Sequence, residues 1–105
     1  MRFIALISFI ITFSAQAAIP CLEEIKDHYE DHGQASDYPV SFRFKKELKA
    51  GDHLTTYWGE VLAVAAEDSI SIEITGSYHS GWFSDEMIVN PLSCKVQGIY
   101  NTYSE

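Results

Sequence analysis

The segment Ile70-Ser71-Ile72-Glu73-Ile74-Thr75 alternates a large aliphatic residue with a polar one at every step. Because successive side chains of a strand point to opposite faces of a sheet, this alternation predicts a strand with one apolar and one polar face. Glu67-Asp68 before the segment and Gly76 after it are typical of turns. We therefore expect the fold to be built around a β-sheet that contains this isoleucine strand.

Four other segments also favour strands, and they are 40–45, 54–66, 82–89 and 94–103. Gly59 interrupts the second of them and predicts a bulge or a sharp bend there. Because short turns join the five segments, we expect an antiparallel meander that can curl into a half-barrel. The spacing around Gly51-Asp52, Gly59 and the isoleucine strand resembles that of small barrels of the SH3 or OB kind.

A helix is expected before the strands, from about Pro20 to His32. Proline suits the first turn of a helix, and Gly33 is typical of a helix end. The apolar residues at helical spacing are Leu22, Ile25 and Tyr29. They form one narrow face, so the helix should lie on the surface of another element. The predicted class is therefore α+β, with an N-terminal helix packed on a five-stranded sheet.

The first residues have the features of a cleavable signal peptide. Arg2 precedes an apolar run over 3–13, and Ala15-Gln16-Ala17 offers small residues where a signal peptidase cleaves. The apolar run is too short to span a bilayer as a helix. We therefore expect residues 1–17 to be a signal peptide and 18–105 to be one small exported domain, periplasmic or secreted, without a membrane anchor after cleavage.

Cys21 and Cys94 are the two cysteines of the chain, one near the mature start and one near the end. An exported protein meets an oxidising compartment, where such a pair is expected to form a disulfide. Their separation is unlike the C-x-x-C spacing of a redox site. We therefore predict one structural disulfide that ties the helix to the last strand.

The chain is acidic, with fifteen Asp or Glu against seven Lys or Arg and a net charge of -8. Cleavage after Ala17 removes one basic residue, Arg2, and no acidic one. Such a field repels nucleic acid and anionic membranes and attracts basic partners. A basic exported protein is therefore the expected partner, although the same acidity also serves solubility alone.

His28 and His32 are four residues apart on the predicted helix, so both imidazoles should lie on one face. With Glu24, Asp27 or Asp31 adding an oxygen ligand, the pair could hold zinc, nickel or copper. The alternative is two ordinary histidines beside the apolar stripe, since no third histidine follows at ligand spacing. No metal or other cofactor is expected.

Aromatic residues gather in the segment 77–83, which we expect to form an exposed turn. Rigid aromatics with polar tips act as anchors in protein interfaces. The candidate binding residues are Tyr57, Trp58, Tyr78, His79, Trp82 and Phe83. Further aromatics of the C-terminal tail are Tyr100 and Tyr103. The alternative is that Trp82 and Phe83 are core residues at the start of a strand.

Together, these features favour a periplasmic or secreted binding protein that inhibits or neutralises a basic protein, in the manner of an immunity protein or a lysozyme inhibitor. A small-ligand or metal-binding barrel remains the alternative. An enzyme is the least favoured class, because the sequence contains neither a G-x-S-x-G elbow nor a glycine-rich phosphate loop. Glu60 and Glu73 could be drawn as an acid and base pair on neighbouring strands. In so acidic a chain, however, two carboxylates are expected to lie close together by chance.

Overall fold

A computed structural model describes residues 19–33, 39–77 and 81–105 of the chain. Its elements are α2 (Leu22–His32), β1 (Val40–Leu48), β2 (His53–Thr55), β3 (Val61–Val64), β4 (Ser69–Ser77), β5 (Trp82–Val89) and β6 (Val96–Ser104). The α+β class, with one helix among the described residues and antiparallel strands, is confirmed. The predicted signal peptide over 1–17 lies outside the described residues. In the described part of the chain, no helix is long and apolar enough to cross a membrane.

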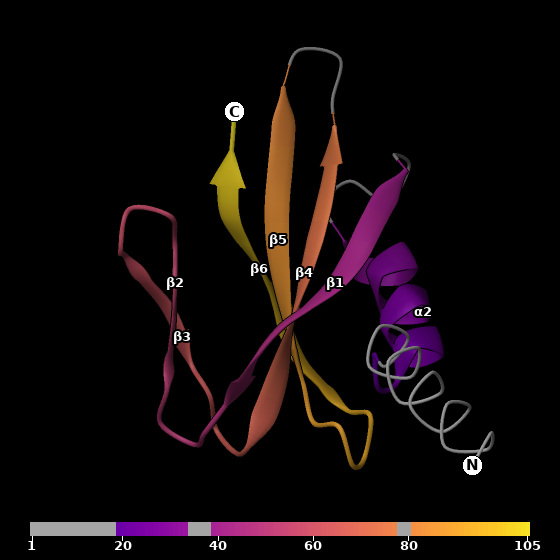
Figure 1. Cartoon of the computed structure of the whole chain (residues 1–105), viewed down its shortest axis with the longest axis vertical. Coiled ribbons are helices and arrows are strands. Elements are labelled where there is room, and N and C mark those ends of the chain that lie inside the picture. The colour runs from indigo at the N-terminus through magenta and orange to yellow at the C-terminus, as the bar shows by residue number, and fades with distance from the viewer. Residues whose placement is uncertain (1–18, 34–38, 78–80) are drawn as a thin grey trace, which may run out of the picture.

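The main sheet contains four antiparallel strands in the order β1-β4-β5-β6, and β2 and β3 pair separately as a hairpin (Figure 1). The isoleucine strand is β4, which lies between β1 and β5. In its register, Ile72 lies opposite Phe44 on β1 and Met87 on β5. Glu73 lies opposite Arg43 and Glu86. These apolar residues of β1, β4 and β5 therefore lie beside one another, and so do these charged residues.

The prediction of five strands is wrong, because the segment expected to be one strand over 54–66 folds back on itself. Gly59 has a φ of 96° and its amide donates to the carbonyl oxygen of Thr56 at 3.0 Å. The amide of Thr56 in turn donates to the carbonyl oxygen of Glu60 at 2.8 Å. A glycine adopts this positive φ without steric cost. The chain therefore reverses at 56–60, and the described residues form six strands in two sheets where five strands in one sheet were predicted.

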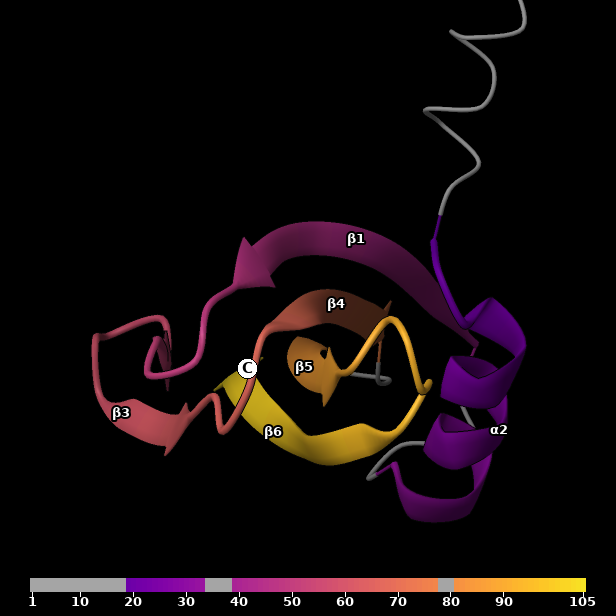
Figure 2. The ribbon, with the colours of Figure 1, turned by 90° about the horizontal axis from the view of Figure 1, so that it is seen from below.

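The helix and the hairpin lie on opposite sides of the four-stranded sheet, as the end-on view of Figure 2 shows. The helix covers the apolar face, where the buried residues of one core are Ile25, Tyr29, Ile70, Ile72, Ile74, Met87 and Val89. The hairpin packs on the other face through a smaller core of Leu48, Leu54, Ala65 and Ile88. The result is three layers, and the sheet is the middle one.

The helix begins two residues later than predicted, because Cys21 has a φ of 62° and is the residue before its first turn. At the other end, the amide of Gly33 donates to the carbonyl oxygen of Tyr29 at 2.7 Å. A Cβ at position 33 would lie 2.4 Å from the Tyr29 ring. Glycine at this helix end therefore leaves room for the tyrosine to pack into the core.

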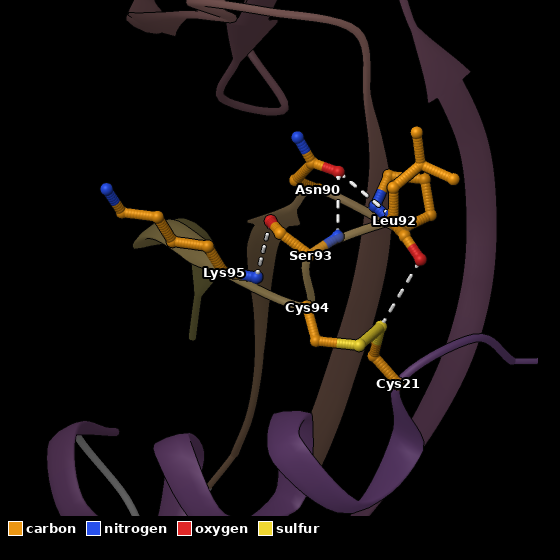
Figure 3. The surroundings of a disulfide bond; sticks show 7 residues. Cys21, Asn90, Leu92, Ser93, Cys94 and Lys95 are labelled. Atoms are coloured by element: carbon orange, nitrogen blue, oxygen red, sulfur yellow. Dashed lines mark hydrogen bonds between the residues drawn. A yellow bond between two sulfur atoms is a disulfide. The ribbon is translucent and has the colours of Figure 1, made fainter.

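Cys21 and Cys94 form the predicted disulfide, which joins the start of α2 to the loop before β6 across 73 residues of sequence (Figure 3). Cys94 also has a φ of 62°, and its amide donates to the carbonyl oxygen of Asn90 at 2.8 Å. The Asn90 side chain accepts from the amides of Leu92 and Ser93 at 2.9 and 3.2 Å. This loop is thus ordered by Asn90, and it presents Cys94 to the helix.

The disulfide also places a sulfur against the loop backbone. The Sγ atom of Cys21 lies 3.6 Å from the carbonyl oxygen of Pro91. Because a disulfide sulfur carries no proton, this is a packing contact and not a hydrogen bond. Without the bridge, the helix would be held to the sheet mainly by Ile25 and Tyr29.

Replacing both half-cystines, as in Cys21→Ala/Cys94→Ala, should lower the free energy of unfolding by about 2 to 5 kcal/mol. The bridge restricts the unfolded chain and fixes the helix to the sheet. Urea unfolding of the variant, compared with the oxidised and the reduced parent, measures the effect. A free energy equal to that of the oxidised parent would contradict this role.

Candidate functional site

Four aromatic side chains form one exposed cluster, which we call the aromatic patch: Tyr57, Trp58, Trp82 and Tyr103. Ring centroids lie 4.7 Å apart for Trp82 and Tyr103, 5.6 Å for Tyr57 and Tyr103, and 5.5 Å for Trp58 and Tyr103. Tyr103 is therefore the centre of the patch. The exposed fractions are 77% for Tyr57, 70% for Trp58 and 44% for Trp82.

The patch is assembled from three separate segments of the chain. The 56–60 turn supplies Tyr57 and Trp58, and the amide of Tyr57 donates to the carbonyl oxygen of Thr102 on β6 at 3.0 Å. β5 supplies Trp82 as its first residue, and its carbonyl oxygen accepts from the amide of Glu105 at 3.0 Å. Backbone hydrogen bonds therefore fix the tip of the hairpin and the start of β5 to the C-terminal strand that carries Tyr103.

A cleft of about 500 Å³ opens beside the patch, between the hairpin and the polar face of the sheet. Its lining residues are Lys45, Thr55, Thr56, Tyr57, Glu73, Trp82, Ser84, Glu86, Thr102 and Tyr103. Three rings of the patch thus form one wall of the cleft. The opposite wall and floor are polar and come from β1, β4 and β5.

Two carboxylates in the floor of the cleft are each held by a cation and a hydroxyl group. Glu86, only 1% exposed, is ion-paired with Lys45 and accepts a hydrogen bond from Ser71 Oγ at 2.7 Å. Glu73 is paired with Arg43, whose Nε donates to Oε1 at 3.0 Å. A buried carboxylate is costly unless it is paired in this way.

A bulge in β1 lies at the cation of the buried pair. Phe44 lies opposite Ile72 and Lys46 opposite Ser71, so Lys45 has no register partner on β4. Its side chain pairs with Glu86 on β5, which is 41 residues away in the sequence.

The structure brings Tyr57, Trp58 and Trp82 of the predicted binding set together. Tyr103 lies at their centre, although the sequence indicates only that it is one of the aromatics of the tail. Whereas Trp82 is 44% exposed, Phe83 is 0% exposed, as the alternative of a core residue at the start of a strand requires. A Cβ at Gly76, its partner on β4, would lie 2.7 Å from the Phe83 ring, so the ring covers this glycine.

Tyr78 and His79 lie outside the described residues. Their proposed part in binding is therefore still a prediction. The remaining tail aromatic, Tyr100, packs against the small core beneath the hairpin. It does not belong to the aromatic patch.

His28 and His32 lie side by side on α2, with ring centroids 4.5 Å apart and planes at 14°. Burial lowers the pKa of His28, and the neighbouring His32 lowers it further, whereas Asp31 raises it. Among the residues that the structure describes, neither histidine belongs to a group of three or more potential metal ligands. In the described part of the chain, the two imidazoles therefore stack on each other and no third potential metal ligand joins them.

One triad of potential metal ligands exists in the described part of the chain: Cys21, Glu24 and Cys94. Both of its sulfur atoms belong to the disulfide, so they are not available as thiolates. Neither this triad nor the histidine pair lines the cleft.

Comparison with known proteins found no match, whether with a family model, a curated protein or a solved structure.

The ion pair beneath the cleft generates a stability prediction. Lys45→Met should lower the free energy of unfolding by about 1 to 3 kcal/mol, because it leaves the Glu86 carboxylate buried without its cation. Adding Glu86→Gln should recover part of the loss, since a neutral amide can still contact Ser71. A double-mutant cycle by urea unfolding measures the coupling, and additive effects would contradict it.

The histidine pair generates a pH prediction. His28 should titrate below the ordinary pKa of histidine, His32→Ala should raise that pKa, and Asp31→Asn should lower it. Since the unfolded chain takes up this proton more readily, protonation of His28 should reduce stability as the pH falls. NMR titration of the imidazole signals measures each shift. An unchanged His28 pKa in both variants would show that the charges of its neighbours do not act on it.

Proposed function

We propose that this chain is an exported binding protein that neutralises a basic protein partner, and that the aromatic patch is its contact surface. The observation that carries the proposal is the patch itself. Four large rings from distant parts of the chain meet at the surface and contact one another instead of packing into the core. Clusters of exposed apolar side chains of this kind mark interaction sites.

The identity and order of these side chains suit an interface. Trp and Tyr are enriched among the residues that contribute most to protein binding, because they bury a large area at a small cost in side-chain entropy. The patch residues restrain one another, and backbone hydrogen bonds to β6 and Glu105 hold the elements that carry them. The surface is therefore organised before a partner arrives, which reduces the entropy lost on binding.

Charge gives the patch its preference for a basic partner. Glu60 adjoins the patch in the hairpin turn, and Glu105 is bonded through its amide to Trp82. Both side chains are exposed, and neither takes part in an ion pair among the described residues. They can pair with lysine or arginine at the rim of an interface, while the rings accept cation–π contacts at its centre.

The rest of the molecule adds a long-range attraction. Helix α2 carries one basic lysine, Lys26, and the acidic residues Glu23, Glu24, Asp27, Glu30 and Asp31. The whole chain has a net charge of -8. Such a field accelerates the encounter with a basic protein at low ionic strength and is screened by salt.

The patch can be tested with Trp58→Ala, which removes an exposed ring that plays no part in the core. Binding to a basic target should weaken by about 2 kcal/mol or more, which is about thirtyfold in Kd. Leu92→Ala is the matched control, because Leu92 is also apolar and is 95% exposed on the loop between β5 and β6. Its effect on binding should be negligible.

Oxidised protein comprising residues 18–105 can be assayed by biolayer interferometry against lysozyme and against basic envelope proteins of the native host. The proposal requires a basic protein that binds the parent and Leu92→Ala, binds Trp58→Ala more weakly, and loses affinity between about 50 and about 300 mM NaCl. Equal binding of all three variants, or absence of any basic binder, would overturn it.

A further inference from the structure

The cleft differs from the rest of the molecule in its charge. The protein as a whole is strongly acidic, but each carboxylate in the cleft floor has its own cation, Lys45 for Glu86 and Arg43 for Glu73. The cleft therefore presents no net charge, although its floor is polar. We propose that it binds a neutral saccharide, with a pyranose ring against Trp82 and Tyr103 and its hydroxyl groups against the floor.

The aromatic wall suits the apolar face of a sugar ring. Trp82 and Tyr103 stack on one another, with centroids 4.7 Å apart and planes tilted by 33°, so each ring keeps one outer face on which a sugar can pack. Tyr57 meets Tyr103 at 70° and closes one end of the wall. The axial C–H groups of a gluco-configured pyranose are apolar and can pack on such a surface. Each tyrosine also retains a hydroxyl group that can bond at the edge of the sugar.

The opposite side of the cleft suits hydroxyl groups, which both donate and accept. The Lys45 ammonium has three donors, and the ion pair with Glu86 does not require them all. Glu73 is an acceptor, and the exposed hydroxyl group of Thr55 can act in either role. Hydrogen bonds to charged groups are stronger than those between neutral groups, so they can hold a sugar hydroxyl in competition with water.

Charge balance excludes the main alternatives for this cleft. A phosphate or carboxylate ligand would lie beside Glu73 and Glu86, and a cation would have to displace Lys45 or Arg43. Displacing Lys45 would leave the buried Glu86 carboxylate without its cation, which is costly, although the Arg43–Glu73 pair is exposed. A neutral polar ligand needs no such exchange. The cleft volume of about 500 Å³ also falls within the range of ligand pockets, about 300 to 1,000 Å³.

This site goes beyond the proposed docking of a basic protein, although both use Trp82, Tyr57 and Tyr103. The two kinds of binding can be separated by salt. Docking of a basic protein on an acidic surface weakens as salt rises, whereas binding of an uncharged sugar does not depend on ionic screening. Failure of one proposal therefore leaves the other open to its own test.

Tryptophan fluorescence offers a direct readout, since Trp58 and Trp82 are the two tryptophans of the chain. In Trp58→Phe, Trp82 becomes the single reporter and lies in the cleft wall. The probes are cellotriose, N,N′,N″-triacetylchitotriose and maltotriose. We expect at least one of them to change the emission of Trp82 saturably below about 10 mM, with the same Kd at low and high salt.

Lys45→Met in the same background should weaken that binding at least tenfold. Lys26→Met is the matched control, since it removes the same charge from α2 on the other side of the sheet and should leave the Kd unchanged. Circular dichroism checks that both variants fold. If Lys45→Met does not fold, Thr55→Val replaces it, because this change removes a cleft hydroxyl from an exposed position.

The proposal is overturned if none of the three sugars gives a saturable change. It is also overturned if Lys45→Met, or Thr55→Val in its place, binds as tightly as the control. Isothermal titration calorimetry of the unmodified protein and of Trp82→Ala provides a check that does not depend on fluorescence. Heat of binding that persists in Trp82→Ala would equally exclude the aromatic wall as the sugar-binding surface.

Discussion

The register of β4 between β1 and β5 is the constraint on which both faces of the molecule depend. Its isoleucines point toward the helix, and Ser71, Glu73 and Thr75 therefore point toward the hairpin. A slip of one residue would exchange the two sets, burying Glu73 under α2 and exposing the core. The same alternation thus builds the hydrophobic core on one side and supplies the polar floor of the cleft on the other.

The sequence predicts well where periodicity is local, and less well where contacts are distant. The alternation in 70–75 is enough to place β4, and the helical spacing of apolar residues before Gly33 is enough to place α2. The segment 54–66 misleads, because its apolar residues fit a long strand as well as a hairpin of two short ones. Gly59 marks a bend, but only hydrogen bonds between Thr56, Gly59 and Glu60 determine that the bend is a complete reversal.

The candidate site could likewise be predicted only where its features are local in the sequence. Tyr57, Trp58 and Trp82 are conspicuous as exposed aromatics near turns, whereas the central role of Tyr103 follows from the pairing of β5 with β6. Phe83 looks equivalent to Trp82 in the sequence, but adjacent residues of a strand face opposite sides, so one ring is buried. The pairing of Lys45 with Glu86 spans 41 residues, and no local pattern indicates it.

The disulfide and the aromatic patch lie at opposite ends of β5. Trp82 is its first residue, and the loop that carries Cys94 follows its last, so the full length of the strand separates them (Figure 1). The bridge can therefore stabilise the fold through the helix and this loop without constraining the patch. Order within the patch must come from nearby contacts: the backbone bonds to β6 and the ring contacts around Tyr103. In this arrangement, the disulfide that stabilises the fold and the proposed binding surface can change independently of each other.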